Sequence, residues 1–282
     1  MLDKLFLSAG AMKAGTTWTY DLLSRHPGVW SAVEKELHYL AHAYGSQPGP
    51  LTDRHRLSRV RAIAGRIDPE KSSPAAVRRR LVALAAYLDD PADNGWYSAQ
   101  FAGRPANSWA ADFSNLTALL DGDGWRKARS VARDMRVLYT LRHPIERAWS
   151  NLKFELAQSG RLGTLADADP AALAKNVRGG PLWQQSEYGT RVRAMRSALE
   201  PHELMLACYE DIGRDPLGWL RRVEVFLGLD PADYPAERLN RRVNEGPADP
   251  VPPAFAAVLE QDHQRVIDEL ADIGFSAPDS WQ

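Results

Sequence analysis

A glycine-bounded loop near the amino terminus has the residue types and spacing of a phosphate-binding site. It runs from Gly10 through Lys13 to Gly15 and leads into a segment, 16–25, with helical character. Glycines allow a loop to curl so that successive N–H groups point inward, and the start of a helix adds partial positive charge. The candidate phosphate ligands in this loop are Lys13, Ala14, Gly15, Thr16, Thr17 and Trp18.

This loop differs from the one that binds nucleoside triphosphates. The triphosphate loop ends in Gly-Lys followed by Ser or Thr, whereas here Gly15 is followed by Thr16 and the lysine stands earlier, at Lys13. The predicted strands also supply no obvious aspartate for magnesium, because the strand over 136–141 ends in Arg142. The loop therefore favours a phosphate ligand held without a metal. A kinase or NTPase-like phosphotransferase is the alternative activity.

A second group of candidate phosphate ligands follows a later predicted strand. Arg142 leaves the carboxyl end of the segment 136–141, the edge at which open α/β sheets bind ligands. Its guanidinium can bind a phosphate through two hydrogen bonds, and the hydroxyl of Ser150 can add another from the following helix. Arg147 shares the helix face of Ser150. A surface ion pair is the alternative role for Arg142 and Arg147.

Together the two motifs resemble those of the sulfotransferases that use 3′-phosphoadenosine 5′-phosphosulfate (PAPS). Residues 13–18, Lys-Ala-Gly-Thr-Thr-Trp, are similar to that family's 5′-phosphosulfate loop, and residues 137–150 are similar to its 3′-phosphate motif. The resemblance implies a P-loop-like sulfotransferase fold. It also implies transfer of a sulfuryl group from PAPS, a cosubstrate, to a hydroxyl or amine of a small-molecule, lipid or saccharide acceptor.

The resemblance further implies a catalytic base in the segment Glu34–Leu40. This segment is similar to the Lys-Glu-Pro-His-Phe-Phe pattern of the carbohydrate- and heparan-type enzymes, so Glu36 is the implied base and Leu37 replaces the usual proline. A histidine is the base in the cytosolic small-molecule subgroup, which leaves His38 as the rival. Lys13 would stabilise charge on the bridging oxygen. We expect burial to raise the pKa of the Glu36 carboxyl toward a useful value, and an ion pair with a lysine is its non-catalytic alternative.

Four further candidates lie outside these motifs. Asp112 stands where the heparan-type enzymes carry a basic residue, so a catalytic lysine does not carry over. Its carboxylate is instead a candidate for binding an acceptor hydroxyl or amine, or for orienting Lys13. Tyr188 is a candidate for an aromatic acceptor site, with core packing as the alternative. The resemblance places Arg241 and Arg242 where the family closes over the adenosine 3′-phosphate.

The candidate residues are separated along the chain, and a parallel sheet would position them. Short apolar segments alternate with helical patterns, which is typical of a mostly parallel central sheet flanked by helices. The predicted strands cover 4–9, 108–112, 136–141 and 203–208, and the predicted helices cover 16–25, 144–157, 215–227 and 253–273. A single domain over 1–282 accounts for this pattern.

A basic helical insertion interrupts the pattern over approximately 45–105. Between Arg54 and Arg80 it holds nine Lys or Arg residues against two acidic ones, a surplus of seven positive charges. Ser73 and Pro74 predict a helix start. One apolar face is expected to follow, made of Val77, Leu81, Leu84, Ala85 and Leu88. A lid is one interpretation of the insertion, and a solvated helical face is the other.

Composition excludes several classes of function. The 282 residues include 35 Lys or Arg and 36 Asp or Glu, a net charge of −1, which argues against binding long nucleic acids as the main role. The single cysteine, Cys208, permits neither an intrachain disulfide nor a cysteine-based metal cluster. No apolar run approaches the ~20 residues that span a bilayer, so we expect a cytoplasmic enzyme. The sequence does not define its oligomeric state. A non-catalytic nucleotide-binding protein of the same fold is the remaining alternative.

Overall fold

A five-stranded sheet forms the centre of the computed structural model, which describes residues 1–46, 49–241 and 250–281. The strands are β1 (Leu2–Gly10), β2 (Val29–Ser31), β3 (Trp109–Asp112), β4 (Ala132–Leu141) and β5 (Leu204–Cys208). Their spatial order is β2-β3-β1-β4-β5, and every neighbouring pair is parallel. In this register Leu7 of β1 lies beside Asp112 and Val137. The predicted α/β fold with a parallel sheet is confirmed.

Helices cover both faces of the sheet, because alternate residues of a strand point to opposite sides. Leu5 and Leu7 of β1 belong to one hydrophobic cluster, whereas Phe6 between them belongs to another. The first cluster includes residues from α2 (Tyr39–Tyr44), α6 (Gly122–Arg129), α7 (Pro144–Gln158), α10 (Tyr188–Arg196) and α14 (Pro253–Asp272). The second includes residues from α1 (Thr16–Leu23), α11 (Glu210–Arg214) and α12 (Pro216–Leu227). Burial on both faces explains the nearly continuous apolar run of β1.

Shorter elements connect these layers. The remaining body helices are α8 (Pro170–Val177), α9 (Pro181–Gln184) and α13 (Ala236–Leu239). The 3₁₀ turns are η1 (Asn115–Leu119), η2 (Leu162–Leu165), η3 (Pro201–Glu203) and η4 (Asp279–Trp281). No helix in the described ranges is both long enough and apolar enough to cross a membrane.

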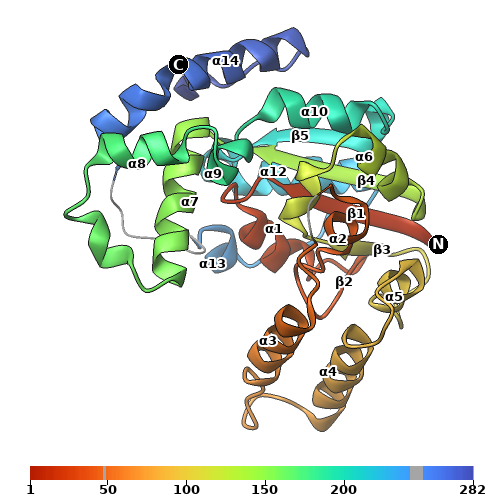
Figure 1. The fold of residues 1–282 in the computed structure, drawn as a ribbon. Helices are drawn as coiled ribbons and strands as arrows, with labels where there is room; N and C mark the ends of the chain where they lie inside the picture. The colour runs from red at the N-terminus through yellow and green to blue at the C-terminus, as the bar shows by residue number, and fades with distance from the viewer. Residues whose placement is uncertain (47–48, 242–249, 282) are drawn as a thin grey trace.

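The strand order creates a topological switch point at the carboxyl ends of β1 and β4. The chain leaves β1 through α1 toward β2 on one side, and it leaves β4 through α7 toward β5 on the other (Figure 1). Parallel sheets bind ligands where their connections diverge in this way. The fold therefore brings the loop after β1 and the residues after β4 to the position expected for a ligand.

Two helices between β2 and β3 project from the body of the molecule. They are α3 (Asp53–Ala64) and α4 (Pro74–Tyr87), which lie side by side away from the sheet and are followed by α5 (Asn94–Ala99) (Figure 1). We call residues 53–88 the arm. The helix start predicted at Ser73 is observed, since its Oγ accepts a hydrogen bond from the Ala76 N–H at 3.2 Å.

The apolar face predicted for α4 is only partly buried. Leu84 is buried against the rest of the arm, but Leu81 is 51% exposed and Leu88 is also exposed. The prediction placed them on one apolar face, and the helices that contact α4, which are α3 and α5, leave part of that face uncovered. The arm therefore presents apolar side chains to its surroundings.

A buried arginine joins the two ends of the arm. The Arg56 guanidinium donates hydrogen bonds at 2.8 Å to both Asp53 and Asp90, and at 3.1 Å to the carbonyl oxygen of Asp89. Residues 53 and 90 are thereby held close together, so the arm leaves and re-enters the body at one point.

Candidate active site

The loop after β1 is folded against β4 and opens toward the start of α1. Its Ala11 N–H donates to the Thr140 carbonyl oxygen at 2.8 Å, and Ala14 N–H donates to the Ala11 carbonyl oxygen at 3.1 Å. Lys13 and Gly15 both have positive φ, at 69° and 81°. The first N–H groups of α1 have no partner within their own helix and carry partial positive charge. This arrangement suits an anion such as a phosphate.

Gly15 is required by both backbone conformation and space. A Cβ at this position would lie 2.9 Å from Cδ1 of Ile212 and 3.1 Å from Cδ2 of Tyr209. We expect Gly15→Ala to lower the free energy of unfolding by ~1–3 kcal/mol. Alanine is strained at a positive φ, and its Cβ would also make these close contacts. Denaturant unfolding measures this change. Gly163→Ala is the control, since nothing lies within 4 Å of its Cβ, and equal losses in both variants would contradict the assignment.

Several cations converge on this loop. The pKa of Lys13 is lowered, first by burial and then by the positive charges of Arg142, Lys153 and Lys35. The Lys13 ammonium also lies 4.5 Å from the centre of the Phe154 ring. Like charges brought this close are costly unless an anion joins them, so the loop has the electrostatics of an anion-binding site.

Arg142 contacts the loop directly. Its Nη1 donates to the Lys13 carbonyl oxygen at 3.1 Å, its Nη2 pairs with Glu146 at 3.2 Å, and its guanidinium lies 4.7 Å from the Tyr209 ring centre. The Arg142 Nε is buried without a hydrogen-bond partner among the described residues. The structure thus brings together Lys13 and Arg142, although they are far apart in sequence, and leaves donor capacity for a ligand.

Tyr188 holds the backbone of Arg142. Its hydroxyl donates to the Arg142 carbonyl oxygen at 2.7 Å and accepts from the Arg142 N–H at 3.3 Å. Tyr188 is fully buried, and burial raises the pKa of its phenol to about 12. Both hydrogen bonds of its hydroxyl go to the backbone of Arg142, the residue that follows β4. Tyr188 was predicted to line an aromatic site for the acceptor, with core packing as the alternative, and it is in the core.

The other predicted nucleotide ligands have different surroundings. Ser150 is half-buried on α7, whereas Arg147 is fully buried and donates to Ser186 Oγ at 2.6 Å and to the Leu182 carbonyl oxygen. The buried Trp18 donates from Nε1 to the Leu239 carbonyl oxygen at 3.2 Å and so ties α1 to α13. Arg241 is exposed, and Arg242 lies outside the described residues.

Glu36 lies in a small polar cluster beside the loop. Its carboxylate accepts from Lys35 Nζ at 2.8 Å, lies 3.3 Å from His38 Nε2 and is 3.4 Å from Asn115 Nδ2. Lys35 Nζ also donates to Thr17 Oγ1 at 3.1 Å. Lys35 therefore links the candidate base to the phosphate-type loop.

The charge state of Glu36 differs from the sequence-based expectation. Burial does push its pKa upward, as expected, but the hydrogen bond from His38 and the positive charge of Lys35 outweigh burial and lower the pKa to about 2. The carboxylate is therefore ionised at any pH near neutrality. The expectation was wrong because sequence shows burial tendencies but not the partners of a carboxylate.

His38 is held from behind by Ser114 and Asp112. The backbone of His38 has φ 54°, and its N–H donates to Ser114 Oγ at 2.7 Å. Asp112 accepts from Ser114 Oγ at 2.5 Å and from the Tyr97 hydroxyl at 2.9 Å. It is fully buried, and burial raises its pKa to about 6 even though both hydrogen bonds oppose the shift. Asp112 thus supports the loop that carries His38 and does not face open space as an acceptor ligand would.

The arm contacts the same cluster. Arg59 of α3 binds the buried carboxylate of Glu34 through two hydrogen bonds, at 2.7 and 3.1 Å. Glu34 in turn accepts from the Glu36 N–H at 3.2 Å. The His55 ring lies 6.4 Å from the His38 ring. The position of the arm and the position of the candidate base are therefore coupled.

Sequence reasoning anticipated a lysine partner for Glu36, which is Lys35, but missed Glu34, Ser114 and Asn115 as parts of this cluster. Lys35 is the one with a readable signal, because it precedes Glu36 directly and is the nearest cation to it along the chain. The other three are recognisable only once β2 and β3 are adjacent. Among the described residues, no group of three His, Cys, Asp or Glu side chains is placed to hold a metal ion.

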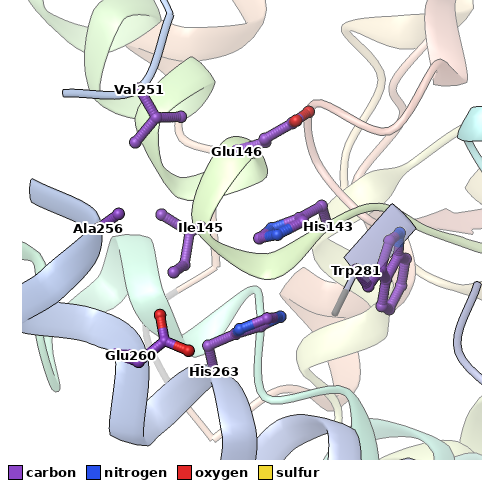
Figure 2. A pocket seen from close by; sticks show the side chains of 8 residues that line it. All are labelled: His143, Ile145, Glu146, Val251, Ala256, Glu260, His263 and Trp281. Atoms are coloured by element: carbon purple, nitrogen blue, oxygen red, sulfur yellow. The ribbon is translucent and has the colours of Figure 1, made fainter. Parts of the chain in front are cut away.

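A pocket of about 360 Å³ lies beside the start of α7 (Figure 2). Its lining residues are His143, Ile145, Glu146, Val251, Ala256, Glu260, His263 and Trp281. The His143 and His263 rings stack at 4.6 Å between centres. Glu146 is shared with Arg142 through their ion pair. The pocket adjoins Arg142, and neither Glu36 nor Lys13 is part of its lining.

Comparison with known proteins agrees with the observed fold. A family model described as "Sulfotransferase family" matches residues 7–233. A sulfotransferase from Alicyclobacillus acidocaldarius is similar in structure, with a TM-score of 0.67 and 17% identity over 100% of this chain and 99% of that one.

Two sulfotransferase domains are also similar in structure. The domain from the curacin biosynthetic pathway has a TM-score of 0.54 and 14% sequence identity over 99% of each chain. The domain from the Synechococcus PCC 7002 olefin synthase has a TM-score of 0.53 and 18% sequence identity over 99% of this chain and 96% of that one. At these identities the likeness shows the fold. No curated protein sequence matches the chain.

Proposed function

Since this chain belongs to the sulfotransferase family, we propose that it transfers the sulfuryl group of PAPS to a hydroxyl or amine of a small-molecule, lipid or saccharide acceptor. The convergence of Lys13, Lys35 and Arg142 on the loop at the sheet's switch point carries this proposal. PAPS carries negative charge on both its 5′-phosphosulfate and its 3′-phosphate, so it needs two neighbouring anion sites. Residues 13–18 supply the first, and Arg142 with Ser150 supplies the second.

The proposed step is an in-line displacement at sulfur. The acceptor oxygen or nitrogen forms a bond to sulfur while the bond from sulfur to the bridging phosphate oxygen breaks, and the bridging oxygen keeps the electron pair. Glu36 accepts the proton that the acceptor loses. Lys13 and the loop N–H groups stabilise the charge that develops on the bridging oxygen. The products are the sulfated acceptor and adenosine 3′,5′-bisphosphate.

Lys35 connects donor binding to the basicity of Glu36. Its ammonium contacts both Glu36 and Thr17, so anionic oxygens at the loop compete with the carboxylate for its charge. When Lys35 turns toward the donor, Glu36 loses an interaction that lowers its pKa and becomes a stronger base. This exchange would provide an ionised base before the donor binds and a more effective one afterwards.

The remaining predicted residues take supporting roles in this proposal. Asp112 acts through Ser114 on the position of His38, and Tyr188 acts on the position of Arg142. Arg241, which is exposed, is a further proposed ligand of the 3′-phosphate. With Glu36 as the proposed base, the proposal assigns the enzyme to the carbohydrate-type subgroup in preference to the histidine-based one.

Incubation of the purified protein with PAPS and cell extracts tests the proposed function. Mass spectrometry should find products that gain a sulfuryl group only when both protein and PAPS are present. Turnover of magnesium ATP without use of PAPS would favour the phosphotransferase alternative. Tight binding of the bisphosphate without transfer to any acceptor would favour a non-catalytic nucleotide-binding protein.

Sulfuryl transfer should survive an excess of metal chelator. Lysine and arginine side chains and backbone N–H groups surround the proposed donor site, and these groups neutralise phosphate charge without a metal. Initial rates with and without EDTA measure this, with added magnesium as the control. A strict magnesium requirement would contradict the proposed charge neutralisation.

A further inference from the structure

The arm carries an unusual share of the exposed apolar surface. Four of the nine large apolar side chains that are exposed in the described part of the chain lie on it, with Leu57 at 58% and Val82 at 63% joining Leu81 and Leu88. Contiguous exposed apolar side chains in a folded protein mark an interaction surface more often than scattered ones do.

Unpaired arginines lie among these apolar side chains. On α4, the exposed residues 78, 79, 81, 82 and 85 fall within one half of the helix circumference at 100° per residue, and the buried Leu84 and Tyr87 lie in the other half. The exposed outer face of α3 holds Arg54, Leu57 and Arg61. No ion pair is found for Arg54, Arg61, Arg78 or Arg79 within the described ranges.

The positive charge of the arm contrasts with the rest of the molecule. The arm, residues 53–88, carries a surplus of six positive charges, while the whole chain has a net charge of −1, so the remainder is net negative by seven. The exposed arginines of the arm thus favour a negatively charged partner.

We propose that the arm docks on an anionic lipid surface. Arginines interleaved with Leu and Val on one helix face suit a lipid interface, because arginine pairs with headgroup phosphates while its stem and the apolar side chains enter the acyl boundary. A protein partner would be expected to engage aromatic anchors. The only Tyr, Trp or Phe in residues 53–88 is the buried Tyr87.

Docking through the arm would also orient the candidate active site. The Arg59–Glu34 ion pair fixes α3 to the segment that leads to Glu36. A bilayer bound to the arm would therefore hold Glu36 at a defined position relative to the lipid surface. The docking itself does not depend on the proposed sulfuryl transfer, since it needs neither donor nor acceptor.

Co-sedimentation of the full chain with vesicles tests the proposal. We expect binding to phosphatidylcholine vesicles that contain phosphatidylglycerol, little binding to phosphatidylcholine alone, and weakening by salt. Arg78→Ala/Arg79→Ala should lower the partition coefficient about 30-fold, on the usual contribution of a basic residue at an anionic membrane. Lys127→Ala/Lys175→Ala removes the same charge from exposed positions on α6 and α8 and should have little effect.

The apolar contribution has its own matched pair. Leu81→Ser/Val82→Ser should weaken vesicle binding, whereas Leu217→Ser/Val225→Ser, at exposed positions on α12, should not. Absence of binding to anionic vesicles at low ionic strength would overturn the proposal. So would full binding by Leu81→Ser/Val82→Ser together with displacement of the vesicles by polyglutamate or duplex DNA, because the arm would then recognise charge alone. Unchanged thermal unfolding shows that each variant remains folded.

Discussion

Glu36→Gln should lower the turnover of sulfuryl transfer by ~10²–10⁴-fold, the usual contribution of a positioned general base. The substitution keeps the shape of the side chain but removes its basicity. The hydrogen bonds that Glu36 makes with Lys35 and Asn115 can rearrange around the amide. Binding of adenosine 3′,5′-bisphosphate should not weaken, because the substitution removes a negative charge that competes with the bound phosphate for Lys35. Steady-state kinetics and a thermal shift with the bisphosphate measure the two effects separately.

His38→Asn is the matched comparison for the base. It should reduce turnover less than Glu36→Gln, since the proposal gives His38 an orienting role at 3.3 Å from the carboxylate. Comparable losses in both variants would indicate a coupled pair in which neither residue is the sole base. Loss confined to His38 would assign the protein to the histidine-based mechanism, and near-wild-type turnover of Glu36→Gln would rule out Glu36.

The pH dependence of the reaction offers an independent check on Glu36. Because its pKa is lowered to about 2 in the free protein, the basic form is present at every pH above that value and is lost only as the pH falls through it. The acid limb of kcat/KM for PAPS, which reports the free protein, should therefore not come from Glu36. If an acid limb near neutral pH disappears in a Glu36→Gln variant that keeps residual activity, the ionised state described above is wrong.

Arg142→Ala should remove most of the preference for adenosine 3′,5′-bisphosphate over adenosine 5′-monophosphate. The substitution deletes a charge-assisted contact to the 3′-phosphate worth ~1.5–3 kcal/mol, or roughly 10- to 150-fold in Kd. In the wild-type protein the bisphosphate should raise Tm by mass action much more than the monophosphate does. Calorimetric titration with both nucleotides measures the affinities directly.

Two controls separate the 3′-phosphate contact from general loss of charge. Lys175→Ala removes an exposed cation on α8 and should leave the preference intact. Tyr188→Phe removes the hydroxyl that holds the Arg142 backbone and should weaken bisphosphate binding less than Arg142→Ala does. Equal stabilisation of the wild-type protein by both nucleotides would contradict the assignment of the 3′-phosphate to Arg142.

The main elements of the fold were predictable because their signals are local. The helix predicted over 144–157 is observed as α7 (Pro144–Gln158), and the one predicted over 253–273 as α14 (Pro253–Asp272). Proline sits in the first turn of both helices, where its missing N–H costs no intrahelical bond. By contrast β2 was not predicted as a strand, since its three residues are too few to establish an apolar pattern.

The proximity of Lys13 and Arg142 was predictable, but the internal contacts of the candidate site were not. Lys13 and Arg142 could be placed together from the loop motif and from the end of a parallel strand. The hydrogen bonds that Asp112 accepts from Ser114 and Tyr97 could not be predicted, because Tyr97 lies on α5, which meets β3 only in the folded chain. The low pKa of Glu36 likewise depends on where two neighbouring side chains turn, which residue types and spacing leave undetermined.

The hydrogen bonds of Arg56 to Asp53 and Asp90 allow the outer part of the arm to vary in length and sequence. Since Arg56 draws Asp53 and Asp90 together and Arg59 binds Glu34, residues 60–87, which lie beyond both arginines, can lengthen, shorten or be replaced without moving the points where the chain enters and leaves the body. Insertions between ends that already meet cost little loop-closure entropy. Helices α2 and α5 remain to carry the chain from β2 to β3. Evolution and protein engineering can therefore change what the arm recognises while the sheet, the phosphate-type loop and Glu36 stay in place.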